Sequence, residues 1–88
     1  MRIRNVRVFD PAALTLTQPK DVVVYGDRIA GVQPANSPVP EGDVVIDGAG
    51  GTLVPGMYEM HGHLGQGNAL LNVAAGVTSV RDMGNENA

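Results

Sequence analysis

The chain has 88 residues, a net charge of −3, six basic residues and three aromatic residues. So few cationic and aromatic side chains argue against a nucleic-acid surface, and the absence of cysteine excludes disulfides, thiolate metal ligands and a cysteine nucleophile. No apolar run approaches the roughly 20 residues of a membrane span, and the start lacks the apolar region of a signal peptide. We therefore expect a cytoplasmic protein that binds neither membranes nor nucleic acid.

The first segment has the pattern of a β-strand. Apolar side chains over residues 3–9 alternate with polar ones, but the alternation shifts from odd to even positions. This shift predicts a β-bulge near Asn5. An Asp-Pro pair within residues 10–13 then ends the strand.

A β-hairpin is predicted next. The β-branched run at residues 21–25 and the apolar-rich stretch at residues 28–32 flank the pair Gly26-Asp27. Two strand-like runs separated by two such residues are typical of a tight hairpin.

Prolines and glycines connect the following elements. Three prolines within residues 34–42 predict a loop before a short strand at residues 43–47. The glycines within residues 48–51 resemble a phosphate-binding loop only superficially, because no Lys-Ser/Thr pair and no helix pattern follow them. We interpret them as a turn that leads into the apolar residues 52–54.

The second half shows the pattern strand, helix, strand. Residues 57–61 and 77–81 are strand-like, and between them Asn68 can cap a short helix over residues 69–75 that Gly76 ends. The connection is long enough for a crossover, so we expect parallel strands and a right-handed connection. The helix face expected to pack on the sheet comprises Leu70, Val73 and Ala74.

His61 and His63 end the first of these two strands. Side chains two residues apart on a strand share a face, so both imidazoles should project the same way, about 7 Å apart at the backbone. A catalytic zinc ion normally takes three protein ligands, so the pair is half of a site. A further ligand would come from a carboxylate, a carboxylated lysine, a partner chain or sequence beyond Ala88. The alternative interpretation is two half-exposed histidines without a ligand role.

Two motifs around the histidines resemble the amidohydrolase superfamily of metal-dependent hydrolases. Residues 54–64, Val-Pro-Gly-Met-Tyr-Glu-Met-His-Gly-His-Leu, resemble the family's Pro-Gly turn, acidic residue and His-x-His at the end of the first barrel strand. Residues 74–84, Ala-Ala-Gly-Val-Thr-Ser-Val-Arg-Asp-Met-Gly, resemble its second strand. Glu59 stands where the family more often has aspartate, at a position that is not a metal ligand. The version here is most similar to the imidazolonepropionase-like and prolidase-like branch.

The resemblance implies an architecture in two parts. Residues 1–54 would form a β-rich, β-sandwich segment, and residues 55–88 would form the first strand, helix and second strand of a TIM-type (β/α)8 barrel. Such a barrel needs about 250 residues, whereas 33 residues follow Pro55. We therefore expect an incomplete fold, the N-terminal piece of a longer enzyme or a truncated form of one.

The resemblance also implies an activity, the hydrolysis of a C–N bond in a small-molecule amide or cyclic amide by a metal-activated water. In this family His61 and His63 would bind one or two divalent ions, most commonly zinc. The other ligands and the catalytic residues would lie beyond Ala88, because Lys20, the chain's only lysine, has no matching position. A homo-oligomer is compatible with this assignment.

Three polar side chains near the histidines have candidate roles. Arg81 could bind a substrate carboxylate, and Asp82 could orient a ligand histidine, or the two could form an exposed ion pair. Glu59 has the same strand parity as the histidines, so it should face inward, near the metal or Arg81.

The competing hypothesis is a non-catalytic β-rich module for partner binding or oligomerisation, because exposed strand edges invite pairing. The two imidazoles on one strand face favour the hydrolase. In either case we expect the 88 residues alone to be inactive as a hydrolase and to self-associate.

Overall fold

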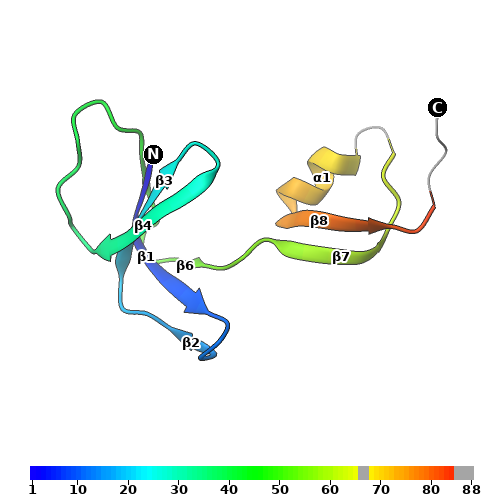
Figure 1. Cartoon of the computed structure of the whole chain (residues 1–88), viewed down its shortest axis with the longest axis horizontal. Helices are drawn as coiled ribbons and strands as arrows, with labels where there is room; N and C mark the ends of the chain where they lie inside the picture. The colour runs from blue at the N-terminus through cyan, green and yellow to red at the C-terminus, as the bar shows by residue number, and fades with distance from the viewer. Residues whose placement is uncertain (66–67, 85–88) are drawn as a thin grey trace. The chain divides into compact units, whose positions relative to one another are not determined.

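The computed structural model of the chain describes residues 1–65 and 68–84. The chain divides into two compact units, Met1–Val54 and Pro55–Ala88. The elements are β1 (Arg2–Asp10), β2 (Thr15–Leu16), β3 (Lys20–Tyr25), β4 (Arg28–Pro34), β5 (Val45–Asp47), β6 (Thr52–Leu53), β7 (Met57–Gly62), α1 (Asn68–Ala74) and β8 (Val77–Asp82) (Figure 1). Among the described residues, no helix has the length and apolar character needed to cross a membrane.

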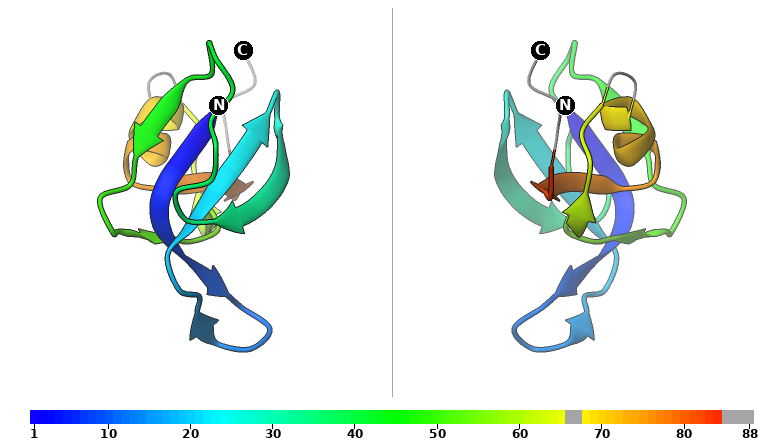
Figure 2. Two further views of the ribbon diagram at one scale, coloured as in Figure 1. Left: turned by 90° about the vertical axis from the view of Figure 1, so that its left-hand side faces the viewer. Right: turned by 90° about the vertical axis from the view of Figure 1, so that its right-hand side faces the viewer.

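Strand β1 is the centre of the sheet in the first unit. β3 pairs antiparallel with its first half and continues into β4, and β2 pairs antiparallel with its end. β5 and β6 pair with β1 in parallel. Figure 2 shows β1 between β3 and β5. The prediction of a β-rich first half is confirmed.

The predicted bulge lies in β1. The pairing register with β3 shifts between Ile3 and Val6, and Asn5 has a φ of +55°. In this left-handed conformation, which asparagine tolerates better than most residues, the Asn5 N–H donates to Oδ1 of Asp21 at 3.1 Å. The side chain of Asp21 therefore takes over a hydrogen bond that the bulge removes from the β1–β3 ladder.

The predicted hairpin is also present, with Tyr25 opposite Arg28 and Gly26 at a φ of +58°. The strands around this hairpin differ from prediction in two respects. Strand β4 extends two residues further, to Pro34, and the short strand β2 was not predicted. The two residues of β2 carry too little pattern to be recognised, and they pair with β1 because Asp10 Oδ1 accepts hydrogen bonds from Ala12 and Ala13 in the turn between them.

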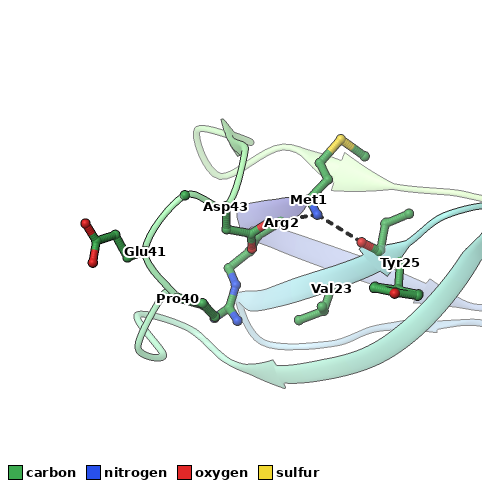
Figure 3. Close-up of a pocket in the computed structure, with 9 residues that line it drawn as sticks. Met1, Arg2, Val23, Tyr25, Pro40, Glu41 and Asp43 are labelled. Carbon is green, nitrogen blue, oxygen red and sulfur yellow. Dashed lines mark hydrogen bonds and ion pairs between the residues drawn. The ribbon is translucent and has the colours of Figure 1, made fainter.

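The loop before β5 approaches the start of β1 and the end of β3, beside a shallow pocket (Figure 3). The Met1 amine donates to the Val24 carbonyl oxygen at 3.0 Å and pairs with the Asp43 carboxylate at 2.8 Å. The hydrogen bond that the Met1 amine donates to the Asp43 carboxylate is the main reason why the pKa of Asp43 lies below its ordinary value. The Asp43 N–H donates to the Pro40 carbonyl in a turn, so β5 begins at Val45 and not at residue 43.

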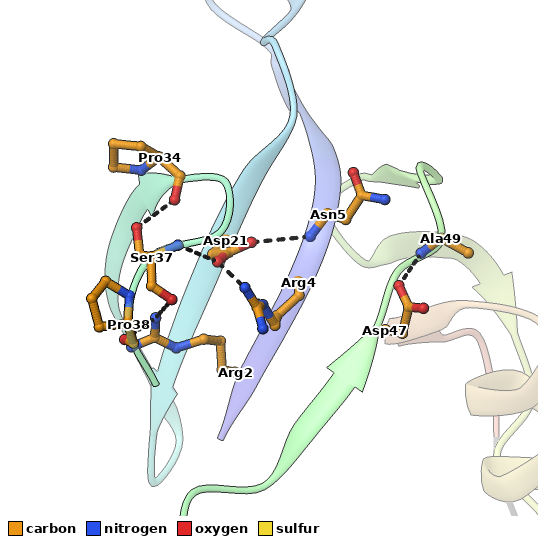
Figure 4. Close-up of polar contacts among 9 residues, drawn as sticks. All are labelled: Arg2, Arg4, Asn5, Asp21, Pro34, Ser37, Pro38, Asp47 and Ala49. Atoms are coloured by element: carbon orange, nitrogen blue, oxygen red, sulfur yellow. Dashed lines mark hydrogen bonds and ion pairs between the residues drawn. The ribbon is translucent and has the colours of Figure 1, made fainter. Parts of the chain in front are cut away.

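A polar cluster lies beside the small apolar core of the first unit, which contains Val6 and Val22. The cluster consists of Asp21, whose exposed fraction is 0%, and the groups of Arg4, Asn5 and Ser37 that contact its carboxylate (Figure 4). The Asp21 carboxylate accepts hydrogen bonds from the N–H groups of Asn5 (3.1 Å) and Ser37 (3.2 Å) and pairs with Nε of Arg4 at 3.5 Å. The cluster thus ties β1, β3 and the loop after β4 together.

In the second unit, β7 and β8 pair in parallel, and α1, which follows β7 in the chain, packs on β8 (Figure 1). Gly76 follows the helix with a φ of +83°, as predicted for the residue that ends it. The prediction that Leu70 packs on the sheet is wrong, because its side chain is 75% exposed. Of the other two residues on the predicted face, Val73 lines the groove beside β8 together with Ala69 and Asn72 but is 62% exposed, and Ala74 is exposed.

Candidate metal centre

His61 and His63 lie at the C-terminal end of β7, His61 within the strand and His63 directly after it. Their ring centroids are 5.4 Å apart, and the ring planes make an angle of 66°. Both side chains are exposed. The structure therefore brings together the two imidazoles that the sequence singled out.

Gly62, between the two histidines, packs against β8. A Cβ atom at this position would overlap Cγ1 of Val80, a β-branched side chain with little freedom to move. The Gly62 carbonyl accepts a hydrogen bond from the N–H of Met83 at 2.9 Å. The residue between the histidines therefore lies against the neighbouring strand with no room for a side chain, and its backbone is hydrogen-bonded to the segment after that strand.

Glu59 and Arg81 hold the strand backbone just before and at the first histidine. Oε1 of Glu59 accepts a hydrogen bond from the N–H of His61 at 3.0 Å. Nε of Arg81 donates to the carbonyl oxygen of Met60 at 2.8 Å, which links β8 to β7. Both side chains are exposed.

Asp82 ends β8 and forms a tight turn. Its Oδ1 accepts a hydrogen bond from the N–H of Gly84 at 3.0 Å. No ion pair joins Asp82 to Arg81, both of which are described residues, so the surface pair considered from the sequence is not formed.

His63 is held at its ring and at its backbone. Nδ1 lies 2.8 Å from the carbonyl oxygen of Gly84, and Nδ2 of Asn68 donates to the His63 carbonyl at 3.2 Å. Because a carbonyl oxygen can only accept, this contact is a hydrogen bond in the neutral tautomer that has its proton on Nδ1 and its lone pair on Nε2. Neither contact was foreseen from the sequence. Asn68 was interpreted only as a helix cap, and a backbone acceptor such as Gly84 leaves no mark on the residue pattern.

The donor chemistry suits a divalent metal in part. Neutral imidazole nitrogens are preferred zinc ligands, and a ligand histidine ordinarily donates its other N–H to an acceptor, as His63 does. Within residues 1–65 and 68–84, no group of three or more His, Asp or Glu side chains could hold a metal ion. The described residues thus offer two of the donors that a metal centre requires.

No protein-family profile matches the chain. Among curated proteins, the chain is 46% identical over 63 residues to a dihydroorotase from Solibacter usitatus and 42% identical over 62 residues to an adenine deaminase from Gluconobacter oxydans. Among solved structures, a candidate prolidase from Bifidobacterium longum superposes with a TM-score of 0.85 and 26% identity over 97% of this chain. The chain belongs to the amidohydrolase superfamily. The resemblance noted in the two histidine-flanking motifs is therefore confirmed.

This amidohydrolase chain corresponds to a small part of these proteins. It spans 14% of the dihydroorotase, 10% of the adenine deaminase and 23% of the candidate prolidase. These relatives are hydrolases that act on C–N bonds. The superposition on the candidate prolidase agrees with a chain in which most described elements are strands.

Proposed function

We propose that the chain forms the N-terminal part of a metal-dependent amidohydrolase that hydrolyses a C–N bond in a small-molecule substrate. Residues 1–54 would contribute to a β-sandwich, and residues 55–88 would form the first β-α-β unit of a (β/α)8 barrel. The parallel strands β7 and β8 with α1 between them in sequence support this assignment. In such barrels the active site lies at the C-terminal ends of the strands, which is where His61 lies on β7.

The paired imidazoles of His61 and His63 carry the proposal. Each ring would give one nitrogen to a divalent ion, most suitably zinc, and the remaining donors would come from residues outside this chain. When bound, one or two such ions would supply a Lewis acid that activates water and polarises the substrate carbonyl. The 5.4 Å ring separation and the hydrogen bond at Nδ1 of His63 support the ligand role.

Arg81 would bind a carboxylate of the substrate. The hydrogen bond from its Nε to the Met60 carbonyl orients the planar guanidinium, so that the terminal Nη groups can face the carboxylate. Similarity to a candidate prolidase favours a dipeptide-like amide within the imidazolonepropionase-like and prolidase-like branch. The Glu59 carboxylate would keep His61 in place by accepting a hydrogen bond from the backbone N–H of His61.

The test uses protein expressed from the complete reading frame, with metal content and hydrolysis of an X-Pro dipeptide and a cyclic amide as readouts. His61→Ala and His63→Ala should each lower zinc affinity by about 100-fold or more, since loss of a residue that merely supports a ligand costs roughly 10–100-fold. Hydrolysis should fall with it. Asp27→Ala, on the exposed hairpin turn, is the control and should change neither. Full metal content and activity in both histidine variants would overturn the proposal and favour the β-rich interaction module.

A further inference from the structure

The segment after β8 is built to present one carbonyl group to His63. The N–H of Met83 is bound to the Gly62 carbonyl at 2.9 Å, and the N–H of Gly84 is bound to Oδ1 of Asp82 at 3.0 Å. These two hydrogen bonds hold the peptide groups on both sides of Met83. The Gly84 carbonyl oxygen then lies 2.8 Å from Nδ1 of His63.

We propose that Asp82 and Gly84 form a positioning clamp that selects the tautomer of His63 with the proton on Nδ1. Asp82 acts through Gly84 and does not itself touch the imidazole ring. The value of the clamp for metal binding rests on the proposed function, whereas tautomer selection does not depend on it.

The chemistry of imidazole explains why a clamp matters. A neutral histidine carries its proton on either nitrogen, and only the other nitrogen can bind a metal. An acceptor fixed at Nδ1 keeps the proton there and leaves Nε2 as the donor atom. The clamp would therefore remove the cost of selecting the tautomer when a metal binds.

The backbone of the clamp requires glycine. Gly84 has a φ of +144°, which residues with a side chain rarely adopt, although a Cβ atom there would meet no neighbour within 4 Å. A substitution at this position would therefore move the carbonyl through backbone strain alone. His61 provides an internal comparison, because no described residue forms a hydrogen bond with its ring.

The test is long-range ¹H–¹⁵N NMR of the 88-residue chain at a pH where both histidines are neutral. His63 of the wild type should show the Nδ1–H tautomer, and His61 should show the averaged signals of an unrestrained ring. Asp82→Ala and Gly84→Ala should bring His63 to the same averaged signals. Asp82→Asn should retain the wild-type pattern, because its amide oxygen can accept the same hydrogen bond from Gly84.

Asp47→Ala is the matched control. Oδ1 of Asp47 accepts a hydrogen bond from the N–H of Ala49 at 2.8 Å, which is the same two-residue turn in the other unit. Its loss should leave the His63 signals unchanged. An unchanged His63 tautomer in both Asp82→Ala and Gly84→Ala would overturn the clamp.

A zinc titration separates this inference from the proposed function. Asp82→Ala should weaken zinc binding roughly tenfold, the lower end of the range for residues that support a ligand, and Asp82→Asn should restore it. If the tautomer responds as expected but zinc binding is unaffected by His61→Ala and His63→Ala, the proposed metal role fails and the clamp stands. If zinc binding needs both histidines while the His63 tautomer is the same in wild type and Asp82→Ala, the clamp fails and the metal role stands.

Discussion

Asp21 is a fully buried carboxylate, and its neighbours explain how the charge is tolerated. Burial by itself raises the pKa of Asp21. Hydrogen bonds from the Asn5 and Ser37 N–H groups, followed by the charges of Arg4 and Arg2, outweigh it and hold the pKa below its ordinary value. The charged form is therefore the one that the folded chain stabilises.

We predict that Asp21→Asn lowers the free energy of unfolding by about 3 kcal/mol, because it removes the carboxylate that pairs with the half-buried Arg4 and a negative charge that interacts with the buried Arg2. One of the two backbone N–H groups also loses its acceptor oxygen. Urea denaturation measures the change. Asp27→Asn, on the exposed hairpin turn, should shift the result by less than about 0.5 kcal/mol, and an equal loss in both variants would contradict the prediction.

The stabilisation that Asp21 provides should depend on pH. Because its folded pKa is lowered, the contribution is complete above the ordinary aspartate pKa of about 3.9 and is lost as the pH falls through the lower folded value. Urea denaturation at a series of pH values should show wild type and Asp21→Asn converging below about pH 3.9. A stability difference that stays constant down to the lowest pH would show that folding does not lower the pKa of Asp21.

At the scale of single elements, local signals identified most of the structure. The hairpin of β3 and β4, the bulge at Asn5 and the order β7, α1, β8 could be predicted, because glycine turns and apolar alternation act over a few residues. The limits of β5 depended on the contacts of Asp43, and the face of α1 depended on where β8 lies. Such contacts join residues that are distant in the sequence, and no local pattern encodes them.

The candidate site follows the same division. The histidine pair was recognisable because of the two motifs that flank it, since His-x-His alone is weak evidence for a metal site. Besides the side chains of Glu59 and Asn68, the groups that hold the pair are backbone carbonyls, which every residue possesses: those of Met60, Gly62 and Gly84. Their role becomes visible only when β7 and β8 are paired.

The bulge in β1 gives a test at this scale. With a φ of +55° at Asn5, Asn5→Val should lower the free energy of unfolding by about 1–2 kcal/mol, because a β-branched residue is strained in the left-handed region. Asn5→Gly should cost much less, since glycine adopts this conformation freely. Urea denaturation distinguishes them. Equal stability of the two variants would mean that the bulge is not retained in solution.

At the scale of the whole chain, many large apolar side chains remain exposed. They include Tyr25 (82%), Ile29 (69%), Tyr58 (74%) and Leu70 (75%). Exposed apolar groups on strands with free edges favour association with other chains.

We therefore predict that the purified 88-residue chain self-associates, with an average mass by light scattering that rises with protein concentration. Ile29→Lys on strand β4 should reduce this association, because a lysine on an edge strand opposes pairing. Arg28→Lys, the adjacent charge-preserving change, should not. A monomeric mass at every concentration would contradict the prediction.

A second prediction for the whole chain concerns activity. The purified 88 residues should not hydrolyse an amide or cyclic amide above the uncatalysed rate, even with added zinc, because two histidines supply fewer donors than a catalytic zinc ion requires. Product formation followed by chromatography provides the measurement. Turnover that His61→Ala abolishes would show that the chain is a complete catalyst.

The contact between Gly62 and Val80 has a consequence for how the histidine motif can vary. The residue that separates the two imidazoles is restricted to glycine by the Val80 side chain on β8, and not by the chemistry of the histidines. Positions 62 and 80 are thus energetically coupled: Gly62→Ala should be harmful beside Val80 and far less so beside alanine at position 80. The size of the side chain at position 80 on β8 therefore limits which residues can stand between the two histidines on β7.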